Sequence, residues 1–226
     1  MSLMNELEQI HWLGHASFFF TDQASGNRIY YVDPFDLHQQ NLAKGDLIFI
    51  THSHPDYLSL NDLKKLLKDD SVVIATPDSL SRIDISHEQK QAVIPNQSYT
   101  VKNFSFQTIP AYNIHPERLQ AHPKANNWVG YIFTINDKKI YHAGDTDFIP
   151  EMKVLKNLNL AVALIPIGGT YTMDVTEAIQ AANAISAKIT IPMHYKRLLG
   201  ENYKDAEEKL KKEVTNSTVV ILKELQ

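Results

Sequence analysis

Histidine and aspartate follow an apolar run at three separate places in this chain. His52 and His54 follow the first run, Asp145 follows the second, and His194 follows the third. Apolar runs of this length predict buried strands, so these side chains should emerge from strand ends on a rigid base. Imidazole nitrogen and carboxylate oxygen are ligands of zinc, and a catalytic zinc site keeps one position open for water. Each segment alone is also typical of a surface histidine or a turn, but together they indicate a metal centre.

The composition limits the other kinds of chemistry. The 226 residues include ten histidines and no cysteine, which excludes disulfides, thiolate nucleophiles and cysteine-ligated metals. The net charge is −4 and the basic residues are scattered, so the electrostatic footprint of a nucleic-acid-binding protein is missing. No apolar run reaches the roughly 18 residues of a membrane span, and residues 1–10 lack the pattern of a secretory signal. We expect a soluble cytoplasmic protein with a small-molecule substrate and no nucleic-acid or membrane partner; a homo-oligomer is left open.

Alternating apolar patterns and turn signals predict the elements that position these residues. The first three strands are short and separated by turns, which predicts an antiparallel meander. Asp174 followed by Glu177 has the spacing of a capping box and predicts a helix through Ser186. The predicted strands are 9–13, 16–21, 28–33, 46–51, 72–76, 91–94, 99–101, 104–109, 128–136, 138–142, 161–166, 188–192 and 217–222. The predicted helices are 60–68, a short one from 77, 151–157, 174–186 and 203–213.

This order of elements favours an α+β fold, a four-layer αββα sandwich with two sheets packed face to face and helices outside. A single β-sandwich and a doubly wound parallel sheet are the alternatives, and the opening meander argues against the second. No linker or low-complexity segment interrupts the chain, so we expect a single domain over residues 1–226. Met4 follows a first methionine closely, which indicates that residues 1–3 are an added extension.

Four motifs in this order resemble the metallo-β-lactamase superfamily, and the resemblance spans almost the whole chain. They are W-L-G-H-A-S at 12–17, T-H-S-H-P-D at 51–56, A-G-D-T-D at 143–147 and I-P-M-H at 191–194. A further set is similar to the small stand-alone metal-dependent hydrolases related to the ascorbate-6-phosphate lactonase. That set comprises P-A-Y-N at 110–113, Y-H-A-G-D-T-D at 141–147, P-I-G-G-T-Y-T-M-D at 166–174 and I-P-M-H-Y at 191–195.

The resemblance implies a metallo-β-lactamase-like fold and a set of metal ligands. His52 and His54 match the two histidines that hold the first metal of the superfamily. Asp145 matches the carboxylate that bridges two metals, and His194 matches the final histidine on the second. Asp56 matches the aspartate of the H-x-H-x-D-H motif, which is also a ligand of the second metal.

At one position the sequence departs from this motif, because Tyr57 stands where the motif has its last histidine. The pKa of a phenol is near 10, which makes tyrosine a poor metal ligand. Whether the centre holds one ion or two therefore stays open. A third histidine for the first metal should come from the long irregular segment 110–127. We prefer His122, because the H-P-K sequence that it opens resembles this branch; His115 is the alternative.

The implied chemistry is hydrolysis. A divalent metal lowers the pKa of bound water to near 7 and polarises a carbonyl or phosphoryl oxygen. Asp56 and Asp145 are the expected catalytic carboxylates, Asp145 as the bridge and Asp56 as a group that orients water or accepts a proton. The candidate substrate contacts are His15, Tyr57, Tyr112 and Asn113. His15 is equally well interpreted as a packing histidine, and His142 is expected to be structural. The histidines without motif support are His11, His38 and His87, expected at the surface or in packing.

Zinc suits this ligand set best, and manganese or iron also fit. The expected bond is an ester, a lactone or a phosphodiester in a small anionic metabolite. The alternative is a metal-binding module of the same fold whose turnover is weakened by Tyr57. Redox chemistry at a di-iron centre is a second alternative, disfavoured because the chain leaves no room for a flavin-binding domain.

Overall fold

The computed structural model describes residues 7–26, 28–39 and 41–225. The extension predicted at residues 1–3 lies outside the described residues. The chain divides into two compact units, the first formed by Met1–Ile94 with Leu222–Gln226 and the second by Pro95–Ile221. Within the described ranges, no helix combines the length and the apolar character needed to cross a membrane.

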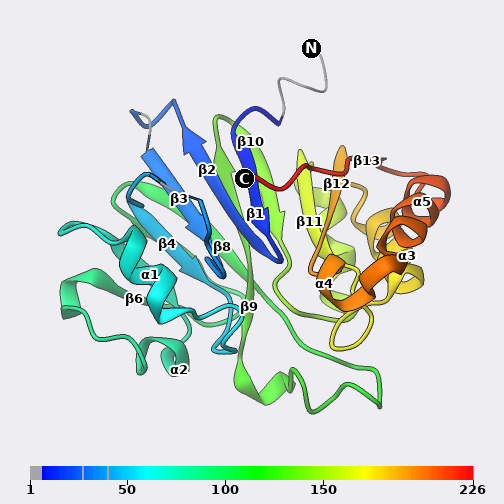
Figure 1. Cartoon of the computed structure of the whole chain (residues 1–226), viewed down its shortest axis with the longest axis horizontal. Coiled ribbons are helices and arrows are strands. Elements are labelled where there is room, and N and C mark those ends of the chain that lie inside the picture. Colours follow the sequence, from blue (N-terminus) through cyan, green and yellow to red (C-terminus); the bar gives the residue numbers. More distant parts are fainter. Residues whose placement is uncertain (1–6, 27, 40, 226) are drawn as a thin grey trace. The chain divides into compact units, whose positions relative to one another are not determined.

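The first unit contains a six-stranded mixed sheet with the order β1-β2-β3-β4-β5-β6 (Figure 1). β1, β2 and β3 pair antiparallel, which confirms the predicted meander. β3 to β6 pair parallel, so the ends of β3 and β4 that lead toward the site residues lie at the same sheet edge. The strands are β1 (Ile10–Gly14), β2 (Ser17–Asp22), β3 (Arg28–Val32), β4 (Leu47–Ile50), β5 (Val72–Ala75) and β6 (Lys90–Ala92).

Helices cover one face of this sheet. α1 (Leu60–Leu66) begins at Ser59, whose side chain accepts a hydrogen bond from the Asp62 backbone, as expected of an N-cap. The apolar side of α1 packs in one cluster with Ile48 and Ile50, which are two residues apart and therefore point to the same face. α2 (Pro77–Leu80) follows β5, and the 3₁₀ turn η2 (His87–Gln89) precedes β6.

The second unit contains a seven-stranded mixed sheet with the order β13-β12-β11-β10-β9-β8-β7. β7 to β10 are antiparallel, including the predicted hairpin of β9 and β10, and β10 to β13 are parallel. The strands are β7 (Ser98–Val101), β8 (Phe104–Pro110), β9 (Val129–Ile135), β10 (Lys138–His142), β11 (Val162–Pro166), β12 (Ile189–Met193) and β13 (Thr218–Val219).

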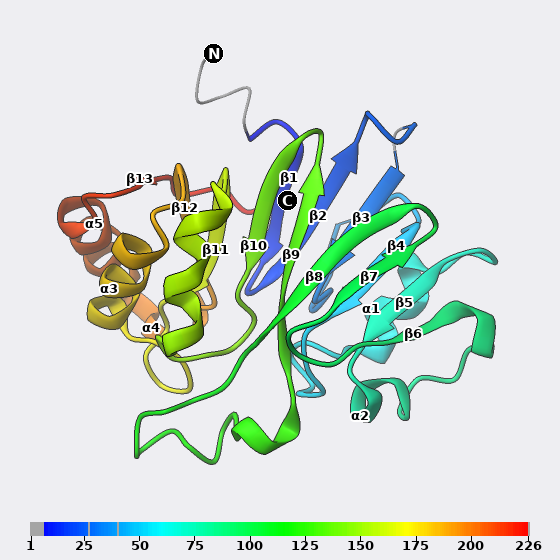
Figure 2. The same ribbon diagram turned by 180° about the vertical axis from the view of Figure 1, so that it is seen from behind.

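The predicted last strand, 217–222, is too long. Only β13 pairs with β12, because from Leu222 the chain belongs to the first unit, where the Leu225 backbone N–H donates to the Trp12 carbonyl at 2.8 Å. The segment between β8 and β9 contains only the 3₁₀ turn η3 (Lys124–Asn126) and extends beyond the ends of both strands (Figure 2).

The helices of the second unit follow the prediction with two corrections. α3 (Val175–Ile185) begins with the predicted capping box, and α5 (Tyr203–Glu213) has the predicted bounds. The segment expected as an α-helix at 151–157 is the 3₁₀ helix η4 (Pro150–Leu158), in which backbone hydrogen bonds span three residues rather than four. The short α4 (Lys196–Leu199) and the turn η5 (Gly200–Asn202) were not expected, because segments of this length have no measurable periodicity.

Candidate metal centre

His52 lies just beyond the end of β4, and its ring is oriented by a buried carboxylate. The Thr51 hydroxyl lies 3.0 Å from Asp33 Oδ2 and 2.9 Å from His52 Nδ1. A hydroxyl has one proton to donate, and an ionised carboxylate can only accept. The Thr51 hydroxyl therefore donates its hydrogen bond to Asp33. Nδ1 of His52 is therefore the donor to Thr51, which leaves Nε2 with its lone pair. This is the outer arrangement found around metal-binding histidines.

That lone pair faces the second histidine of the motif. His52 Nε2 lies 3.1 Å from His54 Nδ1. Two nitrogens bound to one tetrahedral zinc at 2.0–2.1 Å are about 3.3 Å apart. The two imidazoles thus already have the separation that a shared ion requires.

A second pair in the same unit joins the turn after β1 to the loop after β4. His15 Nε2 lies 3.0 Å from Asp56 Oδ2, with side-chain exposures of 10% and 39%. His15 adopts a left-handed backbone with φ of 50°, and Gly14 before it has φ of 103°. The Trp12 indole N–H donates to the His15 carbonyl at 3.1 Å and holds this turn in place.

Tyr57 is completely buried. Its ring centroid lies 4.1 Å from that of His52 and 5.6 Å from that of His15, the latter edge-on. The phenol ring therefore packs against one histidine of each pair.

In the second unit, two imidazoles lie close to the Asp145 carboxylate. Its Oδ2 lies 3.2 Å from His122 Nε2 and 3.6 Å from His194 Nε2, and all three side chains are buried. Two nitrogens that converge on one carboxylate oxygen have the spacing of ligands around an ion, and a carboxylate with two oxygens can bridge two ions.

The orientation of His122 is determined by a backbone group. Its Nδ1 lies 3.1 Å from the Tyr171 carbonyl oxygen, which can only accept. Nδ1 therefore holds a proton, and Nε2, on the side of Asp145, is the nitrogen available to an ion. His115, the alternative ligand, is exposed, and its Nδ1 accepts from the Glu117 backbone N–H at 3.4 Å.

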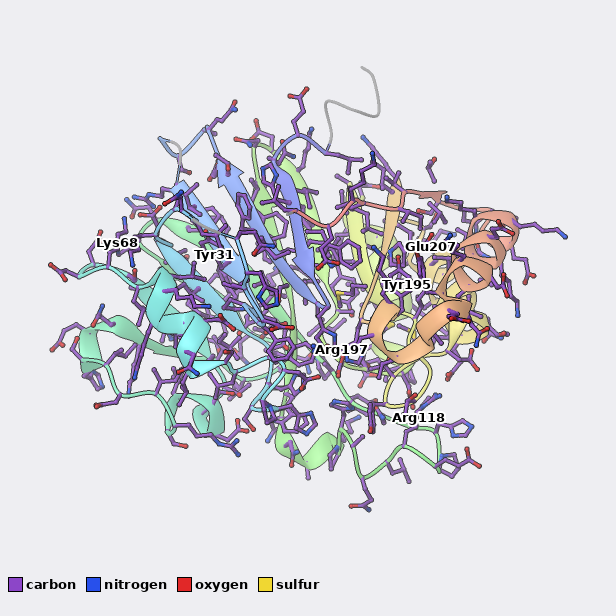
Figure 3. All side chains as sticks on the ribbon, viewed as in Figure 1. Tyr31, Lys68, Arg118, Tyr195, Arg197 and Glu207 are labelled. Atoms are coloured by element: carbon purple, nitrogen blue, oxygen red, sulfur yellow. The ribbon has the colours of Figure 1, made fainter. Side chains whose placement is uncertain are left out.

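A buried ion network anchors the loop that holds His122. Asp147 Oδ2 accepts the backbone N–H groups of residues 114 and 115, each at 2.8 Å. Arg118, labelled in Figure 3, lies 2.9 Å from the other oxygen of Asp147 and 2.5 Å from Glu177 at the start of α3. The loop is thereby tied to the segment after β10 and to the first turn of α3.

The two candidate substrate contacts on this loop differ in their surroundings. The Asn113 side chain is buried, and its amide nitrogen donates to the carbonyls of Arg118 and Tyr171. The Tyr112 hydroxyl donates to Glu151 at 2.9 Å and accepts from Lys124 at 3.1 Å. Burial and the hydrogen bond to Glu151 raise the pKa of Tyr112, although Lys124 partly opposes them.

His194 is held in a left-handed backbone, with φ of 55°. A Cβ at Gly168 would lie 2.3 Å from the His194 carbonyl oxygen, so only glycine allows this approach. The next residue, Tyr195, is buried and donates its hydroxyl to Glu207 on α5 at 2.5 Å, a pair labelled in Figure 3.

The remaining histidines lie where the sequence places them. His142 is buried in β10, and its Nδ1 accepts the Gly144 backbone N–H at 3.2 Å. His11 stacks on Phe19. The exposed ones are His38 and His87.

Sequence reasoning missed Asp33 and the Tyr171 carbonyl. Asp33 follows β3 directly, so the strand-end rule that identified the other site residues could have found it. The Tyr171 carbonyl acts through the backbone, and residue type gives no signal for that.

Comparisons with known proteins identify the family to which the chain is similar. A family model described as "Beta-lactamase superfamily domain" matches residues 9–194. A metal-dependent hydrolase from Thermoplasma acidophilum is 33% identical over 195 residues, which covers 83% of this chain and 83% of the relative. Another, from Archaeoglobus fulgidus, is 30% identical and covers 95% of this chain and 96% of its own length.

Solved structures are similar over nearly the whole chain. The crystal structure of a protein from Parabacteroides distasonis, described as a candidate metal-dependent hydrolase, has a TM-score of 0.82 and 31% identity, covering 96% of this chain and 93% of that one. A metallo hydrolase from Ignicoccus hospitalis has a TM-score of 0.76, 21% identity and coverage of 96% and 95%. The second likeness concerns the fold alone.

Proposed function

Because the chain belongs to the β-lactamase superfamily and is a metal-dependent hydrolase of that superfamily, we propose that it cleaves an ester, lactone or phosphodiester bond in a small anionic metabolite. The observation that carries this proposal is the convergence of two imidazole nitrogens on Asp145 Oδ2, at 3.2 and 3.6 Å.

The proposed ligand set combines the groups of both units. His52, His54 and His122 would hold a first ion, and Asp145 would bridge. Asp56 and His194 would hold a second ion. The motif order in the sequence supports this combination, and the atom separations within each unit support the individual groups.

A divalent ion, most suitably zinc, supplies a water with lowered pKa and a Lewis acid for the substrate oxygen. The chain's own residues would orient the water, accept its proton and hold the ligands. Asp56 is partly exposed and so can orient the attacking water or accept its proton. Asp33 and the Tyr171 carbonyl keep their histidines in the tautomer that presents Nε2.

An anionic substrate is supported by Lys124. Its side chain is 65% exposed and lies two residues after His122 in the sequence. Hydrogen bonds to Tyr112 and Glu151 raise the pKa of Lys124, which keeps it charged. An exposed cation in this place suits a carboxylate or phosphate on the substrate.

Replacing Asp145 tests the proposal. Asp145→Ala should lose bound metal, measured by elemental analysis, together with turnover on a panel of lactones, esters and phosphodiesters. The matched control is Asp137→Ala, an exposed aspartate in the turn between β9 and β10, which should keep both. Full metal content and turnover in Asp145→Ala would contradict the assignment.

The second candidate function is a metal-binding module with weakened turnover, and the observation that favours it is the tyrosine at position 57. A stoichiometric metal without turnover on any substrate of the panel, and without a gain in Tyr57→His, would favour the module over the hydrolase.

A further inference from the structure

We propose that His15 supplies the second ion with the imidazole ligand that position 57 lacks. This inference rests on the proposed function, in which Asp56 is a ligand of that ion. It gives the turn after β1 a direct part in metal binding, in place of the substrate contact or packing role that the sequence suggests for it.

The distance between the two side chains is the first support. His15 Nε2 lies 3.0 Å from Asp56 Oδ2. The other pairs of proposed ligands have similar separations, 3.1 Å for His52 with His54 and 3.2 Å for His122 with Asp145. An imidazole and a carboxylate at this distance can share a proton, and a divalent ion can take the proton's place with small adjustments of both side chains.

The backbone that presents His15 is the second support. A left-handed conformation is unfavourable for a residue with a Cβ, and unfavourable backbone conformations cluster at functional sites. His15 adopts this conformation, with Gly14 before it and the Trp12 indole bonded to its carbonyl. In this turn the His15 imidazole lies against Asp56.

The apolar surroundings are the third support. The His15 ring lies 5.5 Å from the Phe35 ring and 5.6 Å from the Tyr57 ring, measured between centroids. His38 and Asp36 form a comparable pair at 3.1 Å, but their side chains are 81% and 44% exposed. Packing between aromatic rings holds an imidazole in one orientation, as a ligand requires, whereas an exposed pair is free to separate.

Tyr57 fits the same arrangement. Its buried ring contacts both His52 and His15. The phenol therefore fills the volume next to the two imidazoles as a spacer, while the ligand itself comes from another part of the chain.

The decisive variant is His15→Asn. Asparagine tolerates the left-handed backbone, but its side chain is too short to place an atom where Nε2 of His15 lies, and its amide is a poor ligand for zinc. Loss of a purely structural contact to Asp56 would leave two ions bound, whereas loss of a ligand would leave one. His38→Asn is the matched control, since it changes the exposed histidine–aspartate pair of the same unit.

Metal content per chain is the measurement, made by elemental analysis after loading with Zn²⁺ and gel filtration. The wild type and His38→Asn should hold two ions, and His15→Asn should hold one. Two ions in His15→Asn would overturn the inference and leave the proposed function intact. One ion in the wild type would also overturn it, while no ion in the wild type would contradict the proposed function itself.

A measurement on the wild type covers the case in which the variant does not fold. In protein with ¹⁵N-labelled histidine, the second equivalent of ¹¹³Cd²⁺ should produce a one-bond coupling at Nε2 of His15. A His15 signal that the second equivalent leaves unchanged would overturn the inference.

Discussion

Asp33 controls how His52 presents its lone pair, through the Thr51 hydroxyl that lies between them. The Thr51 hydroxyl donates its hydrogen bond to the Asp33 carboxylate. Its oxygen is then an acceptor for His52, so Nδ1 of His52 must be the donor. Asp33 also accepts the Thr51 backbone N–H at 2.7 Å, which holds the first residue after β4 in place. One carboxylate therefore determines both the tautomer and the position of a proposed ligand.

Asp33→Asn should weaken binding of the first ion. The amide keeps an acceptor for the Thr51 backbone but can donate to the Thr51 hydroxyl, which allows the other His52 tautomer. Loss of such outer partners typically lowers metal affinity by about 10–100-fold. Competition with a chromogenic chelator measures this affinity. Asp22→Asn, which changes a buried aspartate bonded to Tyr30 in the same unit, should leave it unchanged, and equal affinities in both variants would refute this role.

At the scale of elements, a buried ion network helps to hold the loop between β8 and β9. Arg118 connects Asp147 with Glu177, and Asp147 also accepts two backbone N–H groups of the loop. Removing one member of a buried ion network leaves the others uncompensated, which costs about 3–5 kcal/mol. The placement of His122 therefore depends on a cation four residues before it in sequence.

Arg118→Met should destabilise the second unit by about 3–5 kcal/mol and raise hydrogen exchange across residues 110–127. Arg118→Lys should recover only part of the loss, because an ammonium lacks the planar fork that reaches two carboxylates. Urea unfolding and hydrogen-exchange mass spectrometry measure the two effects. Arg197→Met, an exposed arginine on α4, is the control, and unchanged exchange in Arg118→Met would refute the anchoring role.

The first turn of α1 depends on another buried carboxylate. Asp62 accepts from the Lys65 ammonium at 2.7 Å, the Ser59 hydroxyl at 2.7 Å and the Asp36 backbone at 2.8 Å. Burial alone would raise the pKa of Asp62, but these hydrogen bonds outweigh it and the pKa is lowered. A lowered carboxyl pKa stabilises the fold above the unfolded pKa, near 3.9, and this contribution disappears as the pH falls through the folded value.

Asp62→Asn should therefore lower the free energy of unfolding by about 1–2 kcal/mol at pH 7, since several hydrogen bonds lose their charged acceptor. The difference from wild type should begin to shrink below about pH 4, near the unfolded pKa, and should decrease further as the pH falls through the lowered folded value. Urea unfolding at pH 7 and pH 3 measures both values. Asp69→Asn, an exposed aspartate after α1, should change neither, and a pH-independent Asp62→Asn difference would contradict the interpretation.

Local signals predicted most of these elements because they act within a few residues. The capping box started α3, and the apolar period gave α5 its bounds. The errors arose where longer-range or weaker effects decide. η4 is 3₁₀ rather than α, and β13 ends at Val219, shortly before the chain passes to the other unit at Leu222.

At the scale of the whole molecule, the predicted fold class is confirmed by the family match and by solved structures of the metallo-β-lactamase type. The family match at 9–194 includes residues of both units, and all the proposed ligands lie within it. Metal binding should therefore be linked to the stability of the folded chain, because a ligand that binds only the native state stabilises it.

Zinc at about 100 times its dissociation constant should raise the free energy of unfolding by about 2.7 kcal/mol over metal-free protein. Thermal unfolding with Zn²⁺ and with EDTA measures this difference. Asp145→Ala should respond to neither addition, whereas Asp137→Ala should gain as much stability from Zn²⁺ as the wild type does. A wild-type melting temperature that changes with neither Zn²⁺ nor EDTA would contradict the proposed metal centre.

The sequence by itself determined the fold class, the order of the elements and which histidines and aspartates follow strand ends. These properties depend on residue type and short-range periodicity, which can be read along one chain. Only the tertiary structure decided which nitrogen His52 and His122 present and what faces Asp56. His122 is oriented by a carbonyl 49 residues away, and His15 meets Asp56 across 41 residues. Such pairings arise from the folding of the backbone, and no local pattern records them.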